Sequence, residues 1–362
     1  MLTYKFKRTL LQIIPFGLIS TIFSVLYILL EKGILGENPI YPSTGNPYSF
    51  ELFIPSVISF IIGLSIGVFE VLFLSKLFQG RSLNHKIFFK IIIYLLIITA
   101  AILVLVIVSN STKLGVGPFN QQIWPQLLTF ISDFAFWSIL LYFSAGIIIC
   151  LLYNEISDNI GQVVLLNFFS GKYHRPIEEE RIFMFLDMKS STAIAEQLGH
   201  IRYFEMLNEY YKNLSEAIIL YGGEIYQYVG DEIVITWKIK TGVVNNCLSC
   251  FFAMKKTLNQ RTAKYLSEYG VLPTFKAGIH FGMVTTGEIG TIKKDIIHSG
   301  DVLNTTARIQ QLCNKYEVEL LVSEKIIGAI TTNGVFQPIK IGESKLRGRN
   351  EKVSLYTIKQ IG

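Results

Sequence analysis

Two acidic residues, Asp187 and Asp231, stand where their carboxylates can meet. Asp187 ends an apolar run (Phe183-Met-Phe-Leu-Asp) that predicts a buried strand, and Asp231 lies in the tight turn of Gln227-Tyr-Val-Gly-Asp-Glu. Carboxylate oxygens are the ligands that Mg²⁺ takes from proteins, and the ion leaves its other positions to water and substrate phosphates. Singly, Asp187 could be a helix cap and Asp231 a turn former. Together they predict a magnesium site for a phosphorylated substrate.

The residues after Asp187 predict a phosphate-binding segment. They open a predicted helix, and the first backbone N–H groups of a helix can bind a polyphosphate. These substrate-binding candidates are Lys189, Ser190, Ser191 and Thr192.

Asn304 and Arg308 form a second candidate group. They are four residues apart in a predicted helix, so they project from one face. An arginine with no acid nearby can stabilise the charge that builds up on a transferring phosphorus. Spacing alone is equally compatible with two polar residues on a helix surface.

The pattern after residue 180 predicts the elements that position these residues. Strands are expected at 181–187, 224–229, 233–237, 274–281, 283–289, 320–322, 336–340 and 353–358, and helices at 192–220, 243–268 and 302–316. The order β-α-β-β-α-β with extensions predicts an α+β domain of the ferredoxin-like, split βαβ type, with helices on one face of the sheet. Its first strand lies beside the hairpin, which brings Asp187 and Asp231 to one edge.

The first part of the chain has a different composition. Residues 1–152 contain 9 Lys and Arg and 5 Asp and Glu, against 24 and 22 in the remainder. Four apolar runs, 10–30, 52–78, 87–108 and 127–153, are each long enough to cross a hydrocarbon core of about 30 Å. We therefore expect an α-helical four-span membrane domain at 1–153, a linker helix and hinge at 154–180, and a catalytic domain at 181–362.

Basic residues lie mainly before the first run and between the second and third. This bias predicts a multi-pass protein of the cell (inner) membrane, in contact with the lipid bilayer and with both termini in the cytoplasm. Glu70 and Asp133 fall within the runs, where acidic residues are candidate functional groups. Ligand sensing, hydration near an interface and hydrogen bonding within the bundle remain open for both. No basic-aromatic stripe indicates binding to nucleic acid.

Residues 181–358 resemble the catalytic domain of class III nucleotidyl cyclases, the adenylate and guanylate cyclase family. Four motifs in order give the resemblance: Phe185-Leu-Asp-Met-Lys-Ser-Ser-Thr, Tyr228-Val-Gly-Asp-Glu, Gly278-Ile-His-Phe-Gly-Met-Val-Thr-Thr-Gly-Glu-Ile-Gly and Gly300-Asp-Val-Leu-Asn-Thr-Thr-Ala-Arg. The resemblance implies the class III cyclase fold and a homodimer. Each shared site then takes its metal ligands from one protomer and its Asn/Arg pair from the other.

The resemblance also implies a role for each residue. Asp187, Asp231 and the Met188 carbonyl would bind two Mg²⁺ or Mn²⁺ ions per site, while Asn304 orients the ribose and Arg308 stabilises the pentavalent phosphorus. A basic contact to the phosphates would come from Arg347 or Arg349.

Base selection departs from the family's usual pattern. Gln227 stands where adenylate cyclases have Lys and guanylate cyclases have Glu, and Ile297 replaces the second, polar selecting residue. Glutamine can donate or accept, so it does not separate adenine from guanine. The absence of the glutamate favours ATP, with GTP and pyrimidine triphosphates left open. His298 is the one histidine near the expected base pocket.

The resemblance therefore predicts a membrane-bound cyclase that converts a nucleoside triphosphate, ATP by preference, to the 3′,5′-cyclic monophosphate and pyrophosphate. Two alternatives remain. The hairpin around Gly230 is similar to that of diguanylate cyclases, which lack the Asn304/Arg308 helix. The second alternative is a catalytically silent cyclase-like domain that binds nucleotide. Such domains usually lose at least one of the four key residues, and this chain retains all of them: Asp187, Asp231, Asn304 and Arg308.

Overall fold

The computed structural model describes residues 4–40, 48–78, 80–330, 334–345 and 352–361. Contacts divide the chain into two compact units, Lys7–Leu166 and Asn167–Gly362, the second joined by Met1–Phe6. Each unit is described by itself.

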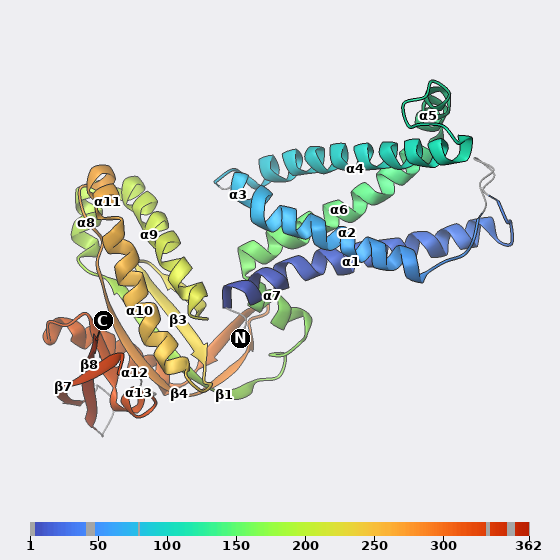
Figure 1. Ribbon diagram of the computed structural model, residues 1–362. Helices are drawn as coiled ribbons and strands as arrows, with labels where there is room; N and C mark the ends of the chain where they lie inside the picture. Colours follow the sequence, from blue (N-terminus) through green and yellow to red (C-terminus); the bar gives the residue numbers. More distant parts are fainter. Residues whose placement is uncertain (1–3, 41–47, 79, 331–333, 346–351, 362) are drawn as a thin grey trace. The chain divides into compact units, whose positions relative to one another are not determined.

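The first unit consists of helices. In chain order they are α1 Tyr4–Leu35, α2 Phe53–Phe69, the π-helical turn η1 Glu70–Leu74, α3 Ser75–Leu77, α4 Leu83–Leu114, α5 Ile123–Ser132 and α6 Phe134–Ile160, after which α7 Gln162–Phe169 leads into the second unit. In the described part of the chain, four stretches are long and apolar enough to cross a membrane, namely Tyr4–Leu35, Phe53–Leu77, Leu83–Leu114 and Phe136–Ile160 (Figure 1). The prediction of four apolar helices followed by an α+β domain is confirmed.

The fourth span differs from its predicted limits. The apolar run at 127–153 was expected to form one helix, but Asp133 is extended (ψ 146°) and separates α5 from α6. The spanning stretch therefore begins after this break and continues to Ile160.

Glu70 lies in a buried network of charged and polar side chains. Its Oε1 accepts hydrogen bonds from Lys90 Nζ at 2.5 Å and Ser75 Oγ at 3.1 Å, and its Oε2 accepts one from Tyr94 Oη at 2.9 Å. Lys90 also donates to Glu155 Oε1 at 3.1 Å. Glu70 and Lys90 are 0% and 1% exposed, so hydrogen bonding within the bundle, one of the open alternatives, is what the structure shows for Glu70. The network links η1, α4 and α6.

Replacing Lys90 by Met should destabilise this bundle. The change leaves Glu70 and Glu155 facing each other without their shared cation, and breaking a buried ion pair from one side costs about 3–5 kcal/mol. We expect a lower Tm for the detergent-purified chain, whereas Lys113→Met, on an exposed part of the same helix, should leave it unchanged. Equal Tm values for the two variants would show that the network adds no stability.

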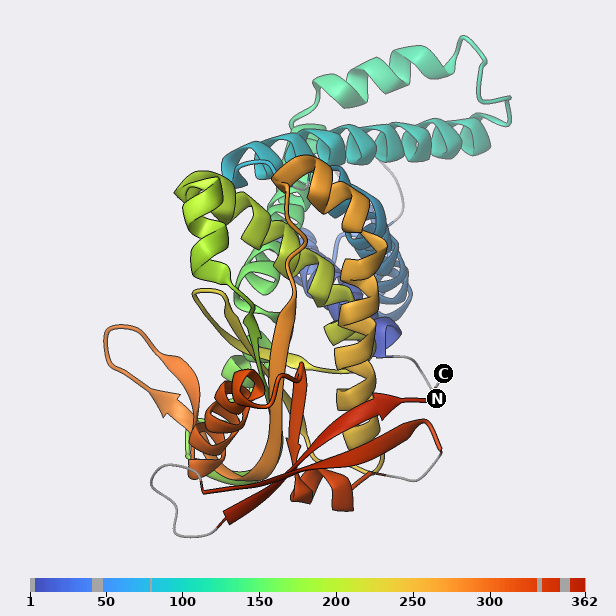
Figure 2. The ribbon, with the colours of Figure 1, turned by 90° about the vertical axis from the view of Figure 1, so that its left-hand side faces the viewer.

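The second unit is built on a mixed sheet. Its strands are β1 Ile177–Met188, β2 Glu224–Val229, β3 Glu232–Lys238, β4 Phe275–Ile289, β5 Asp295–Ser299, β6 Leu320–Ser323, β7 Phe336–Lys345 and β8 Lys352–Gln360. They are ordered β2-β3-β1-β4-β6-β8-β7, and β5 pairs with β4 to form the long hairpin visible in Figure 2. The order β2-β3-β1-β4 is that of a split βαβ sheet, which confirms the predicted fold class.

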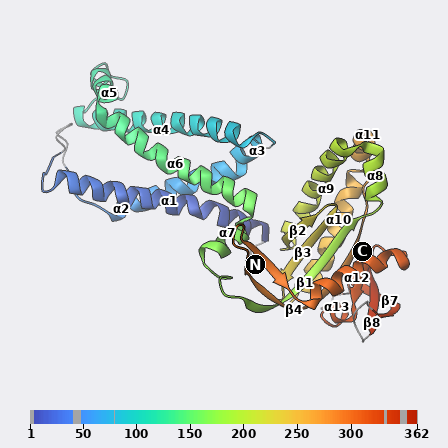
Figure 3. The ribbon, with the colours of Figure 1, turned by 180° about the vertical axis from the view of Figure 1, so that it is seen from behind.

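Helices cover both faces of the sheet, not one as expected. The helices are α8 Ser191–Leu198, α9 His200–Leu220, α10 Val243–Gln260, α11 Thr262–Tyr269, α12 Asp301–Lys315 and α13 Glu324–Gly328. The side chains of α9 and α10 pack with Ile182, Met184 and Leu186 of β1. The helix α12 lies on the opposite face (Figure 3). There its Val302 packs with Phe183.

A glycine allows α12 to approach the sheet. At Gly278 of β4, a Cβ atom would lie 2.4 Å from the backbone nitrogen of Gln310, a distance that real Cβ atoms do not reach. Any larger residue there would push α12 away from β1 and β4, so this glycine fixes the position of the helix beside Asp187.

Candidate active site

Asp187 lies near the end of β1 with a charged residue on each neighbouring strand. It pairs across the sheet with Glu232 of β3 and with Lys276 of β4. Its Oδ2 forms an ion pair with Lys276 Nζ at 3.1 Å and accepts a hydrogen bond from Gln310 Nε2 at 3.2 Å. The side chain is 26% exposed, so this carboxylate is held by its neighbours but open to solvent on one side.

Asp231 is positioned by the hairpin between β2 and β3. Gly230, at φ 63°, makes the turn, and its carbonyl accepts a hydrogen bond from Tyr211 Oη at 2.8 Å. The Tyr211 ring lies 4.5 Å from that of Tyr228, so α9 holds the hairpin at two points.

Electrostatics show that the acidic groups share one region. Burial, followed by repulsion from Asp187 and Asp231, raises the pKa of Glu232 to about 7. In the described part of the chain, no hydrogen bond or ion pair engages Asp187 Oδ1 or the Asp231 carboxylate. Oxygen atoms free of partners and surrounded by like charge suit a divalent cation.

The donor set is incomplete for a cation enclosed by side chains alone. The described residues contain no group of three His, Cys, Asp or Glu side chains arranged to hold a metal ion. An ion here would take further ligands from backbone, water or substrate, as Mg²⁺ commonly does. Met188, the last residue of β1, has a buried side chain, and its carbonyl is the expected backbone ligand.

The segment Lys189–Thr192 leads directly from β1 into α8. Ser190 adopts a left-handed conformation (φ 56°), which turns the chain at the start of the helix. The Lys189 N–H donates to the Thr274 carbonyl at 2.8 Å, and its ammonium pairs with Glu319 at 3.3 Å. Lys189 therefore has other partners, and the backbone from Ser190 to Thr192 is the better candidate for contact with phosphate.

Asn304 and Arg308 lie on the side of α12 away from the sheet. Val302, Thr306 and Cys313 are buried, and at about 100° per residue Asn304 is roughly opposite them. Asn304 is exposed and Arg308 half-buried. Among the residues that the structure describes, neither side chain has a hydrogen bond or ion pair to Asp187 or Asp231.

The expected base-selecting residues come from two separate strands. Gln227 is exposed and follows an irregularity in β2, where the pairing with β3 shifts register. Ile297 is half-buried on β5, opposite Gly287. Arg347 and Arg349 lie outside the described residues.

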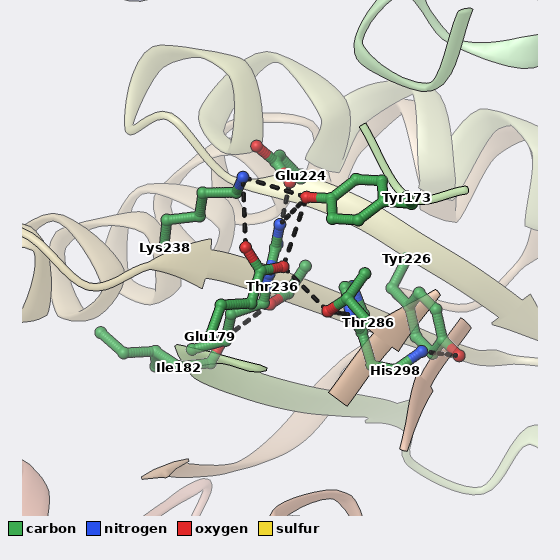
Figure 4. A network of polar contacts seen from close by, with 10 residues as sticks. Tyr173, Glu179, Ile182, Glu224, Tyr226, Thr236, Lys238, Thr286 and His298 are labelled. Carbon is green, nitrogen blue, oxygen red and sulfur yellow. Dashed lines mark hydrogen bonds and ion pairs between the residues drawn. The ribbon is translucent and has the colours of Figure 1, made fainter. Parts of the chain in front are cut away.

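A polar network surrounds the neighbouring His298 (Figure 4). Thr286 Oγ1 donates to Glu179 Oε1 at 2.9 Å and lies 2.8 Å from His298 Nδ1. Because the one hydroxyl proton goes to Glu179, Thr286 must accept from His298, which therefore carries its proton on Nδ1. Tyr226 Oη accepts the His298 backbone N–H at 3.1 Å, linking β2 to β5.

Arg181 stabilises the other end of this network. The guanidinium is 2% exposed and donates to Glu179 Oε1 at 2.6 Å and Glu224 Oε2 at 2.9 Å. Burial raises the pKa of Glu179, but hydrogen bonding and the charge of Arg181 outweigh it and lower the pKa to about 2. Burial and the charge of Arg181 also lower the pKa of His298 to about 4.

This histidine should make stability depend on pH. The folded pKa of about 4 lies below the ordinary value of 6.5, so the unfolded chain binds a proton first as the pH falls. The contribution of neutral His298 to the free energy of unfolding is fully present above pH 6.5 and is lost as the pH falls toward 4. The loss between pH 7 and pH 5 is about 2 kcal/mol. The free energy of unfolding, measured with urea, should fall less between pH 7 and pH 5 in His298→Phe than in the control His200→Phe. Equal losses would contradict the assignment.

The sheet order, with Asp187, Asp231 and Glu232 together at one edge, defines the class of this unit, an α+β domain of the split βαβ type. Residues 175–360 match the family described as the adenylate and guanylate cyclase catalytic domain. Because the match covers half of the chain, the protein belongs to this family.

Two of the curated relatives are bacterial adenylate cyclases. The chain is 31% identical over 205 residues to "Adenylate cyclase 2" of Rhizobium meliloti (strain 1021), covering 56% of each chain. It is 29% identical over 182 residues to "Adenylate cyclase" of Anabaena cylindrica, covering 49% of this chain and 36% of that one. The chain thus matches about half or less of the length of these curated relatives. A solved bacterial light-regulated adenylyl cyclase shares the fold, with TM-score 0.53, 19% identity, and coverage of 63% of this chain and 66% of that one.

Sequence patterns missed three residues beside Asp187. Glu232 follows Asp231 in the hairpin motif, but the motif predicts no role for it, and no sequence pattern indicates Lys276 or Gln310. Lys276 and Gln310 approach Asp187 through the β1–β4 register and the packing of α12. No local pattern marks either one, since both contacts join parts of the chain about 90 residues or more apart.

Proposed function

We propose that the protein is a membrane-bound adenylate cyclase that forms 3′,5′-cyclic AMP and pyrophosphate from ATP. The convergence of Asp187 and Asp231 beside the start of α8 is the observation that carries this proposal. The Asp231 carboxylate and Asp187 Oδ1, which have no partner among the described residues, lie next to backbone that can bind a triphosphate. The family match and the names of the relatives support the same reaction.

The reaction needs the ribose 3′-oxygen to attack the α-phosphorus while the bond to pyrophosphate breaks. Asp187, Asp231 and the Met188 carbonyl would hold two Mg²⁺ or Mn²⁺ ions, which would supply positive charge to the hydroxyl and the triphosphate. The backbone of Ser190–Thr192 holds phosphate oxygens. Asn304 orients the ribose and Arg308 offsets the negative charge that develops on phosphorus. Arg347 or Arg349 provides a further phosphate contact.

The direction of α12 supports a homodimer with shared sites. Because Asn304 faces away from the sheet that carries the carboxylates, the pair serves the site of a second protomer better than its own. In a twofold dimer each contact occurs twice, so two equivalent sites form.

ATP is the preferred substrate in this proposal. Gln227 lacks the carboxylate that would accept hydrogen bonds from guanine, and the curated relatives are named adenylate cyclases. The four long apolar helices support the proposal of a multi-pass protein anchored in the cell membrane, and the positive bias of the loops supports a cytoplasmic location for both termini.

The test is product identification with the full chain in lipid nanodiscs. Each of the four nucleoside triphosphates is supplied with Mg²⁺ or Mn²⁺, and products are separated by chromatography. Cyclic AMP as the main product supports the proposal, and cyclic GMP or a cyclic pyrimidine nucleotide would reassign the base. A cyclic dinucleotide would favour a diguanylate cyclase. Nucleotide binding without turnover would favour a silent domain.

A further inference from the structure

Lys276 forms an ion pair with one oxygen of the Asp187 carboxylate, which is expected to bind metal. Its Nζ lies 3.1 Å from Asp187 Oδ2, and it also donates to Asn314 Oδ1 at 3.1 Å. The lysine side chain is only 12% exposed. Gln310, 4% exposed, donates to the same Oδ2 at 3.2 Å. This oxygen therefore has two donors, while Oδ1 has none among the described residues.

The fold fixes this arrangement from three elements. Lys276 is the direct cross-strand partner of Asp187, and side chains at such positions share one face of the sheet. Gly278, two residues further along β4, lets α12 approach closely enough for Gln310 to reach the carboxylate. Asn314, one turn after Gln310, holds the ammonium from its other side.

An ammonium and a divalent ion compete for the same carboxylate oxygen. Mg²⁺ binds carboxylate oxygen at about 2.1 Å, so an ion on Oδ2 would lie within a few ångströms of Lys276 Nζ. Two cations this close repel strongly where water is partly excluded. An ion on Oδ1, which faces away from these donors, meets less repulsion. The two oxygens of Asp187 are therefore unequal as metal ligands.

We propose that the ammonium group of Lys276 competes with a divalent ion for Asp187 Oδ2. As a result, the nucleotide-free site binds one divalent ion tightly and a second one weakly. Gln310 is a positioning residue that keeps Oδ2 toward Lys276 and Oδ1 toward the first ion. This inference rests on the proposed function, since it assumes that Asp187 binds two ions. It assigns the affinity for the second ion to a lysine of the chain itself.

The test counts bound Mn²⁺ by electron paramagnetic resonance of the free ion, using the full chain in nanodiscs without nucleotide. For the wild-type chain we expect one tight and one weak ion. Lys276→Met should tighten the weak ion at least tenfold, and Lys276→Arg, which keeps the cation, should leave it weak. Lys264→Met is the matched control, because Lys264 pairs with Glu209 away from Asp187.

A Lys276→Met chain with wild-type Tm and wild-type Mn²⁺ affinity for both ions would overturn the inference, as would weaker binding of the second ion. These outcomes are distinguishable from failure of the proposed function. If no triphosphate is cyclised but the Mn²⁺ affinity shifts as expected, the lysine competes at a metal site that serves another reaction.

Discussion

Replacing Asp187 or Asp231 by Asn should reduce the rate of cyclic nucleotide formation about a thousandfold. Asparagine keeps the shape of the side chain but removes the charge that binds the cation. Loss of one group that stabilises transition-state charge costs about 10²–10³ in rate, and loss of the ion removes more than one interaction. The measurement is kcat at saturating ATP over a range of Mn²⁺ concentrations.

Higher Mn²⁺ should not restore these variants, because the missing interaction is the ligand itself. Glu268→Gln is the control, since Glu268 is exposed on α11 and, among the described residues, its side chain pairs only with Lys264; this variant should keep wild-type activity. Full activity in Asp187→Asn with an intact fold would show that this carboxylate does not bind the catalytic metal.

Replacing Arg308 by Met should lower kcat about a thousandfold with little change in KM for ATP. The guanidinium is expected to act where charge develops on phosphorus, so its loss affects the transition state more than substrate binding. Arginines with this role in phosphoryl transfer contribute about 10³–10⁵ in rate. Steady-state kinetics over ATP concentration separate the two parameters.

Lys315→Met gives the matched control for this change. Lys315 is the last residue of the same helix and is exposed, so its loss should leave both parameters unchanged. A rise in KM at constant kcat for Arg308→Met would assign this arginine to ground-state binding.

Much of the fold could be predicted because its patterns are local. The strand at 224–229 has the predicted limits, since the hairpin turn at Gly230-Asp231 defines its end. The helix predicted at 192–220 is interrupted at Gly199, where φ 75° and ψ 160° are incompatible with helix. The strands predicted at 274–281 and 283–289 are one strand, β4, because Gly282 accommodates Val302 of α12 without ending the strand.

Features that depend on distant contacts could not be predicted. β5 at Asp295–Ser299 is defined by its pairing with β4, and its five residues are too few to show a clear strand periodicity. Lys90 lies within the apolar run at 87–108, and its buried ion pair with Glu70 depends on how α4 packs. The acidic and Asn/Arg candidates could be found from spacing and family motifs, whereas Lys276 and Gln310 required the register and the helix packing.

The most direct test of a shared site is to mix two inactive variants. Asp231→Ala protomers lack a metal ligand, and Arg308→Ala protomers lack the guanidinium. After random pairing, half of the dimers contain one of each and have one intact site, so about a quarter of wild-type activity should return. If the mixture stays inactive while both variants are shown to form mixed dimers, the carboxylates and the Asn304/Arg308 pair do not meet across two protomers.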